Sequence, residues 1–463
     1  MSISHNCGFA VTHSLQDAYK AGLALQHRGR EAAGIVAIGE KIDALKWIGT
    51  IDAFSIKQLH QIFPGTNYHT FMVHVRYATR GRKDKLLEDA HPHVIGGTMH
   101  PRGDHIAILN CDKAIVHNGQ VAPAYFSDIP KTDVKTECDT ELLLHYYAKY
   151  GEKAILQNIP GAYTLAIADK SRNDIIILRD KTGIRPGVLG ISSGKYSVAS
   201  EDIVFQSEED SVAENLDPGA VYYLSHSGKY RKEQVVQPAL SRCFFEWNYL
   251  ANKKSIINRV SVLHLRRALG RKCAEEFHFE ADYVTYLPDC PKDAAMAYSD
   301  KCNIPFMITM YKKNQERSFL GSTQEERQNS IQKNLHLIPN IKTKIQGKRI
   351  ILIDDSEIRG TNAERATHLL KEEAGVKEVI LINYTPMVGI IGDDGQERYC
   401  DNGVDIPKGD KFIAKGRTQE EISKLQGIPT YFLSVAGMLQ TFESMGLPKH
   451  TLCTFCIGGK KPF

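Results

Sequence analysis

The sequence predicts two mixed α and β units in succession: a layered unit of sheets and helices to about residue 235, and then a unit built on a parallel sheet. Three observations predict this fold class. Short strand-like runs separated by turn residues dominate the first half, whereas strand and helix patterns alternate in the second half. The chain has 463 residues, of which 42% are hydrophobic and 24% charged, so it is long enough for two or three globular domains.

The first half consists mainly of strand-like runs separated by clusters of Gly, Asn, Asp and Ser. These runs are residues 34–39, 69–79, 114–119, 162–168, 175–180, 196–201 and 220–225. Residues 15–28 place apolar side chains at helical spacing, and a second helical run, 140–151, ends at Gly151, which can cap it. Helices beside sheets predict the layered arrangement.

The second half alternates between the two patterns. Strands are predicted at residues 281–288, 304–309, 348–355 and 377–386, and helices at 260–277, 293–303, 361–375 and over most of 418–445. Residues 312–334 are polar and nearly free of large apolar side chains, which indicates either a lid over a bound substrate or a plain solvated loop and helix.

Charge and targeting patterns exclude several classes of partner. The net charge of +4 is too small for this length to indicate nucleic acid or membrane binding, and no apolar run approaches the roughly 18 residues of a membrane span. The first residues lack a secretory pattern, so we expect a cytoplasmic protein. Ten cysteines are too few for a disulfide scaffold of this length, and in a reducing compartment they indicate metal, catalysis or core packing.

A phosphate-binding strand end is predicted at residues 349–363. A buried strand ends in Asp354 and Asp355, and a short loop containing Gly360 then opens a helix. Backbone amides at a helix N-terminus form an anion site, glycine permits close approach, and adjacent acids suit ribose hydroxyls or a metal. The alternative without a bound phosphate is an acid-rich turn followed by a helix cap. Side-chain donors in the same run are Ser356, Thr361 and Asn362.

Cys7 is a candidate nucleophile near the start of the chain. If residues 1–6 are removed, its free α-amine, with a pKa near ~8, can act as the base for its own thiol. Taken alone, a cysteine after a short leader is more often a core thiol.

Four further segments give Cys7 a context: LQHRGREAAGI, HVRYATRG, IVHNGQV and CDTE. Together they resemble the class II glutamine amidotransferases. The glutaminase domain of that family is an N-terminal-nucleophile hydrolase with four layers in the order αββα. The resemblance implies that Cys7 attacks the glutamine amide, while Asn118 and the backbone N–H of Gly119 form the oxyanion hole. It also implies that the residues binding glutamine are Arg76 on the carboxylate, Asp139 on the ammonium group, and Thr79.

The strand end at 349–363 resembles the phosphoribosyl pyrophosphate (PRPP) motif of type I phosphoribosyltransferases, with Asn362 where a second threonine is usual. A glutaminase joined to such a transferase resembles the amidophosphoribosyltransferase family over nearly the whole chain. The implied division is a removed leader, 1–6, a glutaminase domain, 7–236, and a transferase domain, 237–463. The implied PRPP-binding residues are Asp354, Asp355, Ser356, Arg359, Gly360, Thr361 and Asn362, with Lys312 and Lys313 from the lid, and Mg²⁺ would bind at Asp354 and Asp355.

The family resemblance also implies a reaction, a second cofactor and partners. Glutamine, PRPP and water would give 5-phosphoribosylamine, glutamate and pyrophosphate, the first committed step of purine synthesis. One branch of the family carries a [4Fe–4S] cluster, and its ligand positions match Cys243, Cys400, Cys453 and Cys456. A Cys₄ zinc site or four unliganded thiols are the alternatives. The resemblance further implies a homodimer or homotetramer inhibited by purine nucleotides.

Two segments depart from the family pattern. Residues 288–295 read PDCPKDAA where small residues usually offer backbone donors, and Pro291 removes one of them. Residues 311–319 keep basic side chains but lose an Arg-Tyr pair. Two alternatives therefore stay open: an amidotransferase that aminates another phosphoribosyl or phosphorylated acceptor, and a non-enzymatic sensor that binds PRPP or nucleotide.

Overall fold

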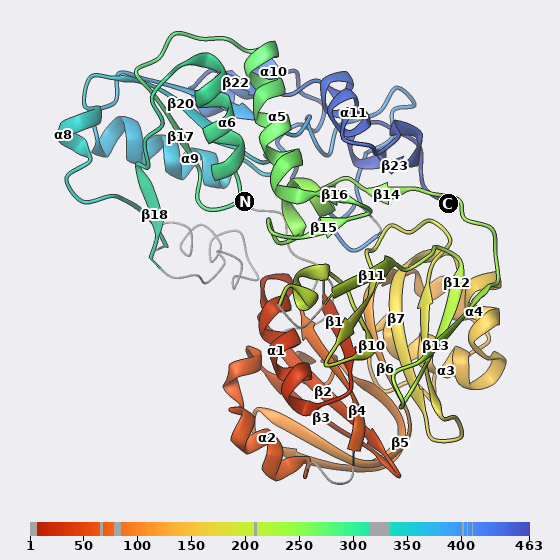
Figure 1. Ribbon diagram of the computed structural model, residues 1–463. Coiled ribbons are helices and arrows are strands. Elements are labelled where there is room, and N and C mark those ends of the chain that lie inside the picture. Colours follow the sequence, from red (N-terminus) through yellow and green to blue (C-terminus); the bar gives the residue numbers. More distant parts are fainter. Residues whose placement is uncertain are drawn as a thin grey trace.

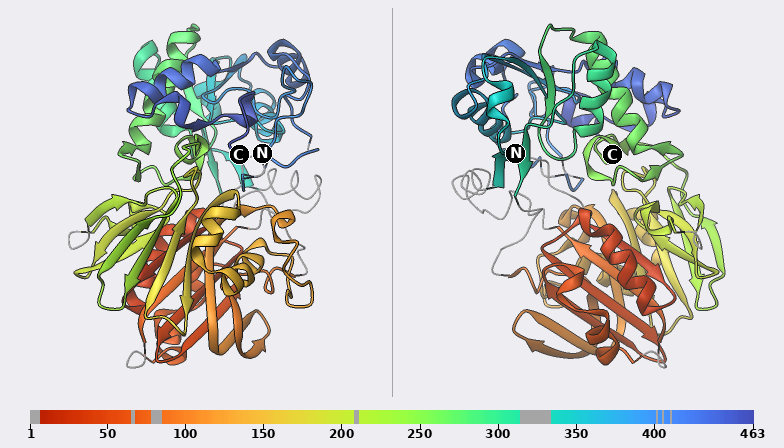
Figure 2. Two further views of the ribbon diagram at one scale, coloured as in Figure 1. Left: turned by 90° about the vertical axis from the view of Figure 1, so that its right-hand side faces the viewer. Right: turned by 60° about the vertical axis from the view of Figure 1, so that its left-hand side comes forward.

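The computed structural model describes residues 7–64, 68–77, 85–207, 211–313, 334–400, 402–404, 406–409 and 411–463. The first half forms one body around a large antiparallel sheet, and the second half forms another around a small parallel sheet (Figure 1). Two further views show the same two bodies stacked on each other (Figure 2).

A 13-stranded sheet organises the first half, in the order β11-β9-β10-β1-β4-β2-β3-β6-β7-β8-β12-β13, with β5 beside β6. Neighbouring strands pair antiparallel throughout. Its strands are β1 (Gly8–Thr12), β2 (Ala32–Gly39), β3 (Ile42–Ile48), β4 (Tyr68–Arg76), β5 (His93–Arg102), β6 (His105–Val121), β7 (Gly161–Asp169), β8 (Asp174–Arg179), β9 (Val188–Ser192), β10 (Lys195–Ala199), β11 (Ser211–Asn215), β12 (Ala220–Ser225) and β13 (Tyr230–Gln234).

The strand alternation divides this body into four layers. Phe9 and Val11 of β1 point into a core between the two halves of the curled sheet, whereas Ala10 between them faces α1 (Leu15–Leu25) and α2 (Ile56–Ile62). On the opposite half, Val116 enters the inner core and Ile115 faces α3 (Asp139–Tyr150) and α4 (Glu152–Asn158). These central strands are therefore apolar on both faces, whereas β5 and β13 are largely exposed, and the predicted αββα fold class is confirmed.

The two helices predicted in the first half form close to their expected positions. Ser14 caps α1, because its side chain accepts a hydrogen bond from the backbone N–H of Asp17. Residues 26–28, which the pattern included in this helix, form a separate 3₁₀ turn. The helix α3 ends at Gly151, whose φ of +79° stops it as expected.

A four-stranded parallel sheet in the order β17-β20-β21-β22 organises the second half, which confirms the predicted parallel sheet. Its strands are β17 (Tyr283–Tyr286), β20 (Arg349–Asp354), β21 (Glu378–Asn383) and β22 (Thr430–Phe432). The helices around it are α5 (Val262–Glu276), α6 (Lys292–Cys302), α8 (Lys342–Ile345), α9 (Thr361–His368), α10 (Gln419–Gln426) and α11 (Val435–Ser444).

One prediction for the second half was wrong, and one correctly predicted helical segment contains a strand that its pattern did not indicate. Residues 304–309 form no named strand; they contribute a single bridge, from Phe306 to Val284, before the short strand β18 (Met310–Lys312) pairs with β19 (Leu335–Leu337). The helical segment 418–445 contains β22 between its two helices. Three residues are too few to show an alternating pattern, so only the sheet edge reveals this strand.

The two halves meet around the segment that follows β13. The strand β14 (Arg242–Cys243) pairs in parallel with β23 (Leu452–Cys453), so the last part of the chain returns to the start of the second half. A π-helical turn (Glu246–Leu250) follows, in which Trp247 packs edge-on against Phe442 with ring centroids 5.9 Å apart. Among the described residues, no helix is long and apolar enough to cross a membrane.

Close packing of α5 on α6 makes a testable prediction at Gly270. A Cβ atom there would lie 2.1 Å from the carbonyl oxygen of Ala294 in α6. We expect Gly270→Ala to lower the free energy of unfolding by about 1–3 kcal/mol, because the backbone clash outweighs the better helix propensity of alanine. Urea unfolding followed by circular dichroism measures this. Ala268→Gly in the same helix is the matched control, and equal stability of wild type and Gly270→Ala would contradict the packing argument.

Candidate active sites

A cavity of about 90 Å³ in the first half collects the predicted glutaminase residues. Its wall includes Cys7, Arg76, Gly119 and Asp139, which come from the start of β1, the end of β4, β6 and the start of α3. Cys7 and three of the four segments that carried the resemblance therefore converge on one cavity, and the fourth, residues 25–35, contacts Cys7 through Arg28.

Cys7 is held at this cavity by its neighbours. Its Sγ donates to the backbone carbonyl of Tyr77 at 3.6 Å, and its own carbonyl accepts from Nε of Arg28 at 3.0 Å. Burial raises the pKa of the Cys7 thiol above its ordinary value. A base is therefore needed to activate this sulfur at neutral pH.

Opposite charges face each other across the cavity. Arg76 is 5% exposed, donates to the carbonyl of Leu86 at 3.1 Å and lies 4.0 Å from a carboxylate oxygen of Asp89. Asp139, the first residue of α3, accepts from the backbone N–H of Val121 at 2.7 Å. A cation and an anion in one small cavity match the two charged groups of an α-amino acid. The third predicted contact, Thr79, lies outside the described residues.

The predicted oxyanion pair lies in consecutive positions of β6. Gly119 lines the cavity with φ +155°, and a Cβ there would lie 1.9 Å from the carbonyl oxygen of Ala162, so only glycine fits. Asn118 is fully buried beside it, and its Nδ2 donates to Oγ of Ser200 at 3.4 Å. The side chain of Asn118 is not part of the cavity wall, whereas the backbone of Gly119 is.

A network of buried charges lies behind Cys7. Besides holding the carbonyl of Cys7, Arg28 donates to Glu201 and to both oxygens of Glu246, the latter at 3.1–3.2 Å. Arg185 donates to Glu246 at 3.1 Å. These four side chains are at most 2% exposed, and two positive charges offset two negative charges.

This network extends to two further cavities, a large cleft between the halves and a small cavity lined by cysteines. Burial opposes ionisation of Glu201, but His27 and Arg28 outweigh it and hold the pKa of that carboxyl well below its usual range. His27 in turn lines a large cleft shared by the two halves. At the other end, Arg185 donates to the carbonyl of Asn402, whose N–H donates to Sγ of Cys400 at 3.3 Å. Sequence patterns gave no sign of this network.

The cleft between the halves has a volume of about 1020 Å³. Segments from the first half, including Gln26, His27 and Arg30, form one wall, and the carboxyl end of β20 forms another. Among the predicted PRPP residues, those that line it are Lys312, Asp354, Asp355, Ser356 and Asn362. The others, Lys313, Arg359, Gly360 and Thr361, are not part of its lining.

The polar side chains at the end of β20 are held by hydrogen bonds within the turn. The N–H of Asp355 donates to Oδ1 of Asp354 at 2.8 Å, and Oγ of Ser356 donates to Oδ2 of Asp355 at 2.8 Å. Burial raises the pKa of both carboxyls, and repulsion from Asp354 raises that of Asp355 further. Gly360, with φ +84°, turns the chain into α9.

The loop of residues 288–295, which departs from the family pattern, also lines the cleft. Its lining residues are Asp289, Cys290 and Lys292. The thiol of Cys290 donates to the carbonyl of Asn248 at 3.4 Å, so it is turned toward the joint between the halves. Sequence reasoning missed Arg266 in α5, a buried cation in the same lining that donates to two carbonyls at 2.8 and 2.9 Å. Most of the predicted lid, residues 314–333, lies outside the described residues.

The four cysteines of the predicted cluster line one small cavity at the joint. Cys243 and Cys453 are paired across β14 and β23, Cys456 follows in the next turn, and Cys400 comes from the loop after β21. None of the four forms a disulfide bond within the part of the chain that the structure describes.

Sulfur spacing distinguishes the possible metals. In a tetrahedral zinc site with Zn–S bonds of about 2.3 Å, every pair of sulfurs lies about 3.8 Å apart. Among the described residues, no three of these four sulfurs lie within 4.8 Å of one another. A cubane binds each cysteine through a different iron and so needs wider spacing. The donor set therefore fits a [4Fe–4S] cluster better than a single zinc ion.

Comparisons with known proteins agree with this geometry. A sequence profile of the glutamine amidotransferase domain matches residues 114–247. The amidophosphoribosyltransferase of Mycobacterium bovis is 31% identical over 95% of this chain and 82% of its own length. That of Methanocaldococcus jannaschii is 29% identical over 96% of this chain and 93% of its own.

A solved structure extends the similarity to the fold. The glutamine PRPP amidotransferase of Bacillus subtilis, solved with ADP and GMP, superposes with a TM-score of 0.80 at 27% identity. The match covers 98% of this chain and 97% of that one, so both halves and their arrangement are shared.

The buried charge network makes a prediction at Glu246. Glu246→Gln leaves two buried guanidinium groups with one carboxylate, and we expect a loss of about 3–5 kcal/mol in the free energy of unfolding. The exposed pair Lys153–Glu233, with a 2.5 Å contact, supplies the control Glu233→Gln, for which about 0–1 kcal/mol is expected. Urea unfolding of both variants checks this, and equal losses would mean that burial of the network contributes nothing special.

Proposed function

The chain belongs to the amidophosphoribosyltransferase family, and from this premise we propose how its two sites carry out the reaction of that family. Glutamine, PRPP and water give 5-phosphoribosylamine, glutamate and pyrophosphate, the step that commits material to purine synthesis. The observation that carries the proposal is the pairing of a cysteine-containing cavity for an amino acid with a cleft that contains a PRPP-type strand end.

At the first site, Cys7 attacks the side-chain amide of glutamine. Arg76 binds the α-carboxylate and Asp139 binds the α-ammonium group, which fixes the amide over the sulfur. The backbone N–H of Gly119 stabilises the oxyanion of the tetrahedral intermediate, and the amide of Asn118 joins it once it turns from Ser200 toward the cavity. Ammonia leaves, and water hydrolyses the thioester to glutamate.

Removal of residues 1–6 would supply the base that the buried thiol needs. The freed α-amine of Cys7 takes the thiol proton and later delivers it to the departing ammonia. Intact-mass measurement of active protein tests this step. Active protein that retains residues 1–6 would contradict it.

At the second site, Asp354 and Asp355 accept hydrogen bonds from the ribose hydroxyls, and the turn into α9 binds the 5-phosphate. These carboxylates and Ser356 are oxygen donors that suit Mg²⁺, which when bound neutralises charge on the pyrophosphate leaving group. Arg266, Lys292 and Lys312 add positive charge around the same cleft, which offsets the donor lost at Pro291.

The proximity of the two sites gives ammonia a short route. Arg28 touches the carbonyl of Cys7, while Gln26 and His27, immediately before it, line the transferase cleft. One turn of chain thus separates the two sites. We place the channel along this segment, with domains of residues 7–236 and 237–463 on either side.

We assign a [4Fe–4S] cluster to Cys243, Cys400, Cys453 and Cys456 as a structural group that ties the second half together. Arg185 stands next to this cavity and offsets part of the negative charge of four thiolates. The relative solved with ADP and GMP supports regulation by purine nucleotides, and a homodimer or homotetramer is the proposed assembly.

The function is tested by an anaerobic assay of glutamate and pyrophosphate with glutamine, PRPP and Mg²⁺. Both products should appear in equal amounts. Cys7→Ala should lower the glutamine-dependent rate at least about 10³-fold and leave ammonia-dependent synthesis intact. Cys302→Ala, in α6, is the matched control. Glutamate release without PRPP-dependent pyrophosphate would instead favour the second candidate, amination of another phosphorylated acceptor.

Cluster binding has its own test by iron and sulfide analysis of anaerobically purified protein. About four iron and four sulfide per chain are expected, and Cys400→Ser should lose both, because one iron then lacks its thiolate. The Cys302→Ala variant should keep them. Zinc without iron or sulfide would overturn the assignment.

A further inference from the structure

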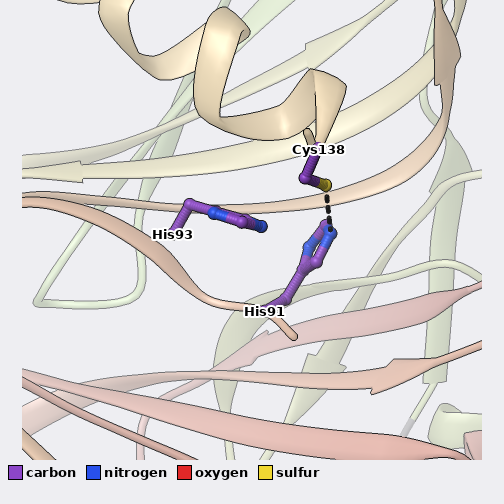
Figure 3. Close-up of side chains that lie close together, drawn as sticks. All are labelled: His91, His93 and Cys138. Carbon is purple, nitrogen blue, oxygen red and sulfur yellow. Dashed lines mark hydrogen bonds between the residues drawn. The ribbon is translucent and has the colours of Figure 1, made fainter. Parts of the chain in front are cut away.

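Three metal-ligating side chains meet at the edge of the glutaminase cavity. His91 and His93 flank Pro92 at the start of β5, and Cys138 caps α3 (Figure 3). One ligand atom of each lies within 4.8 Å of the other two, and both histidines are buried. In the part of the chain that the structure describes, this is the one group of at least three such donors that is this compact.

His93 already has the arrangement of a metal ligand. Its ring bonds the backbone of Asp89, and its Nε2 is buried without a hydrogen-bond partner among the described residues. The nitrogen that bonds a backbone carbonyl carries the proton, so Nε2 presents a lone pair. Metal-binding histidines characteristically hold their second nitrogen in this way. A buried lone pair with no donor is otherwise unfavourable.

The other two donors lie close together but have further partners. Nε2 of His91 lies 3.3 Å from Oγ1 of Thr140 and 3.8 Å from Sγ of Cys138, and that sulfur lies 3.7 Å from Oδ1 of Asp139. Nδ1 of His91 accepts from the backbone N–H of His117 at 3.3 Å, so its proton is on Nε2. Metal binding would release the Cys138 thiol proton to water and shift the His91 proton to Nδ1, at the loss of that long hydrogen bond. His91 is therefore the weakest of the three ligands.

We propose that His91, His93 and Cys138 bind one Zn²⁺ ion whose fourth position faces the glutamine cavity, so that zinc inhibits glutamine hydrolysis. Two imidazoles and one thiolate suit zinc, and three protein ligands leave one position open. His91 and Cys138 line the same cavity as Cys7, and Asp139 follows Cys138 directly. An ion here would therefore occupy the space of the substrate ammonium group.

The charges around the proposed site determine whether zinc and glutamine compete for it. Arg76 and Lys46 are nearby cations, and Asp89 and Asp139 are nearby anions. A bound zinc ion adds two positive charges, of which the Cys138 thiolate offsets one. The ion and the ammonium group of glutamine compete for the same anionic surroundings, so glutamine should protect against zinc.

The binding test uses Zn²⁺ alone and does not depend on enzyme activity. Equilibrium dialysis is performed with cluster-loaded Cys7→Ala protein, which lacks the competing active-site thiol. One zinc per chain is expected, and Co²⁺ should give a thiolate charge-transfer band. Both His93→Gln and Cys138→Ser should lose this zinc, whereas Cys302→Ser should retain it. Equal zinc binding by all variants would overturn the site.

The inhibition test rests on the proposed function and uses protein with Cys7 intact. Zinc should inhibit the glutamine-dependent rate, spare the ammonia-dependent rate, and lose potency as glutamine is raised. His93→Gln should keep normal activity and need at least about tenfold more zinc for inhibition. Unchanged zinc sensitivity in His93→Gln would place the inhibitory ion on Cys7 instead. Protein that binds zinc at this site but uses no glutamine would refute the proposed function and leave the metal site standing.

Discussion

The buried pairing of Arg28 and Arg185 with Glu201 and Glu246 is the interaction on which the rest of the structure depends. Removing four charges from water costs several kcal/mol per ion, and only the close mutual hydrogen bonds make their burial tolerable. Arg28 ends the turn before β2, Arg185 precedes β9 and Glu201 follows β10. Glu246 begins the π-helical turn of the second half. Neither half can therefore shift alone without leaving a buried charge uncompensated. This constraint fixes the spacing between Cys7, the cleft and the thiol cavity.

This arrangement also explains why the transferase cleft is built from both halves. The segment that ends in Arg28 lines the cleft with Gln26 and His27, and Glu201 hydrogen-bonds to Ser255 at 2.7 Å and to the N–H of Asn252 at 2.9 Å. Glu201 therefore contacts residues of both halves beside the cleft.

Sequence patterns predicted the features that depend on residues close together in the chain. The alternation of apolar residues predicted most of the strands. The family resemblance carried by short motifs predicted that Cys7, Arg76 and Asp139 belong to one site and the end of β20 to another, and the structure brings these segments to two cavities. Contacts between distant segments could not be predicted: Arg28 and Glu246 are 218 positions apart, and each alone resembles an ordinary surface charge. The wall of the cleft formed by the first half and the meeting of His93 with Cys138 were missed for the same reason, whereas β22 was missed because three residues are too few to show an alternating pattern.

The parallel pairing of β14 with β23 has a consequence for the order of assembly. Cys243 and Cys453 become neighbours only when residues 210 positions apart in the sequence meet. The first half contains its own sheet and cores, so it can fold while the ribosome is still producing the second half. Closure of the joint must wait for the final segment. Until then the apolar lining of the thiol cavity stays open to solvent.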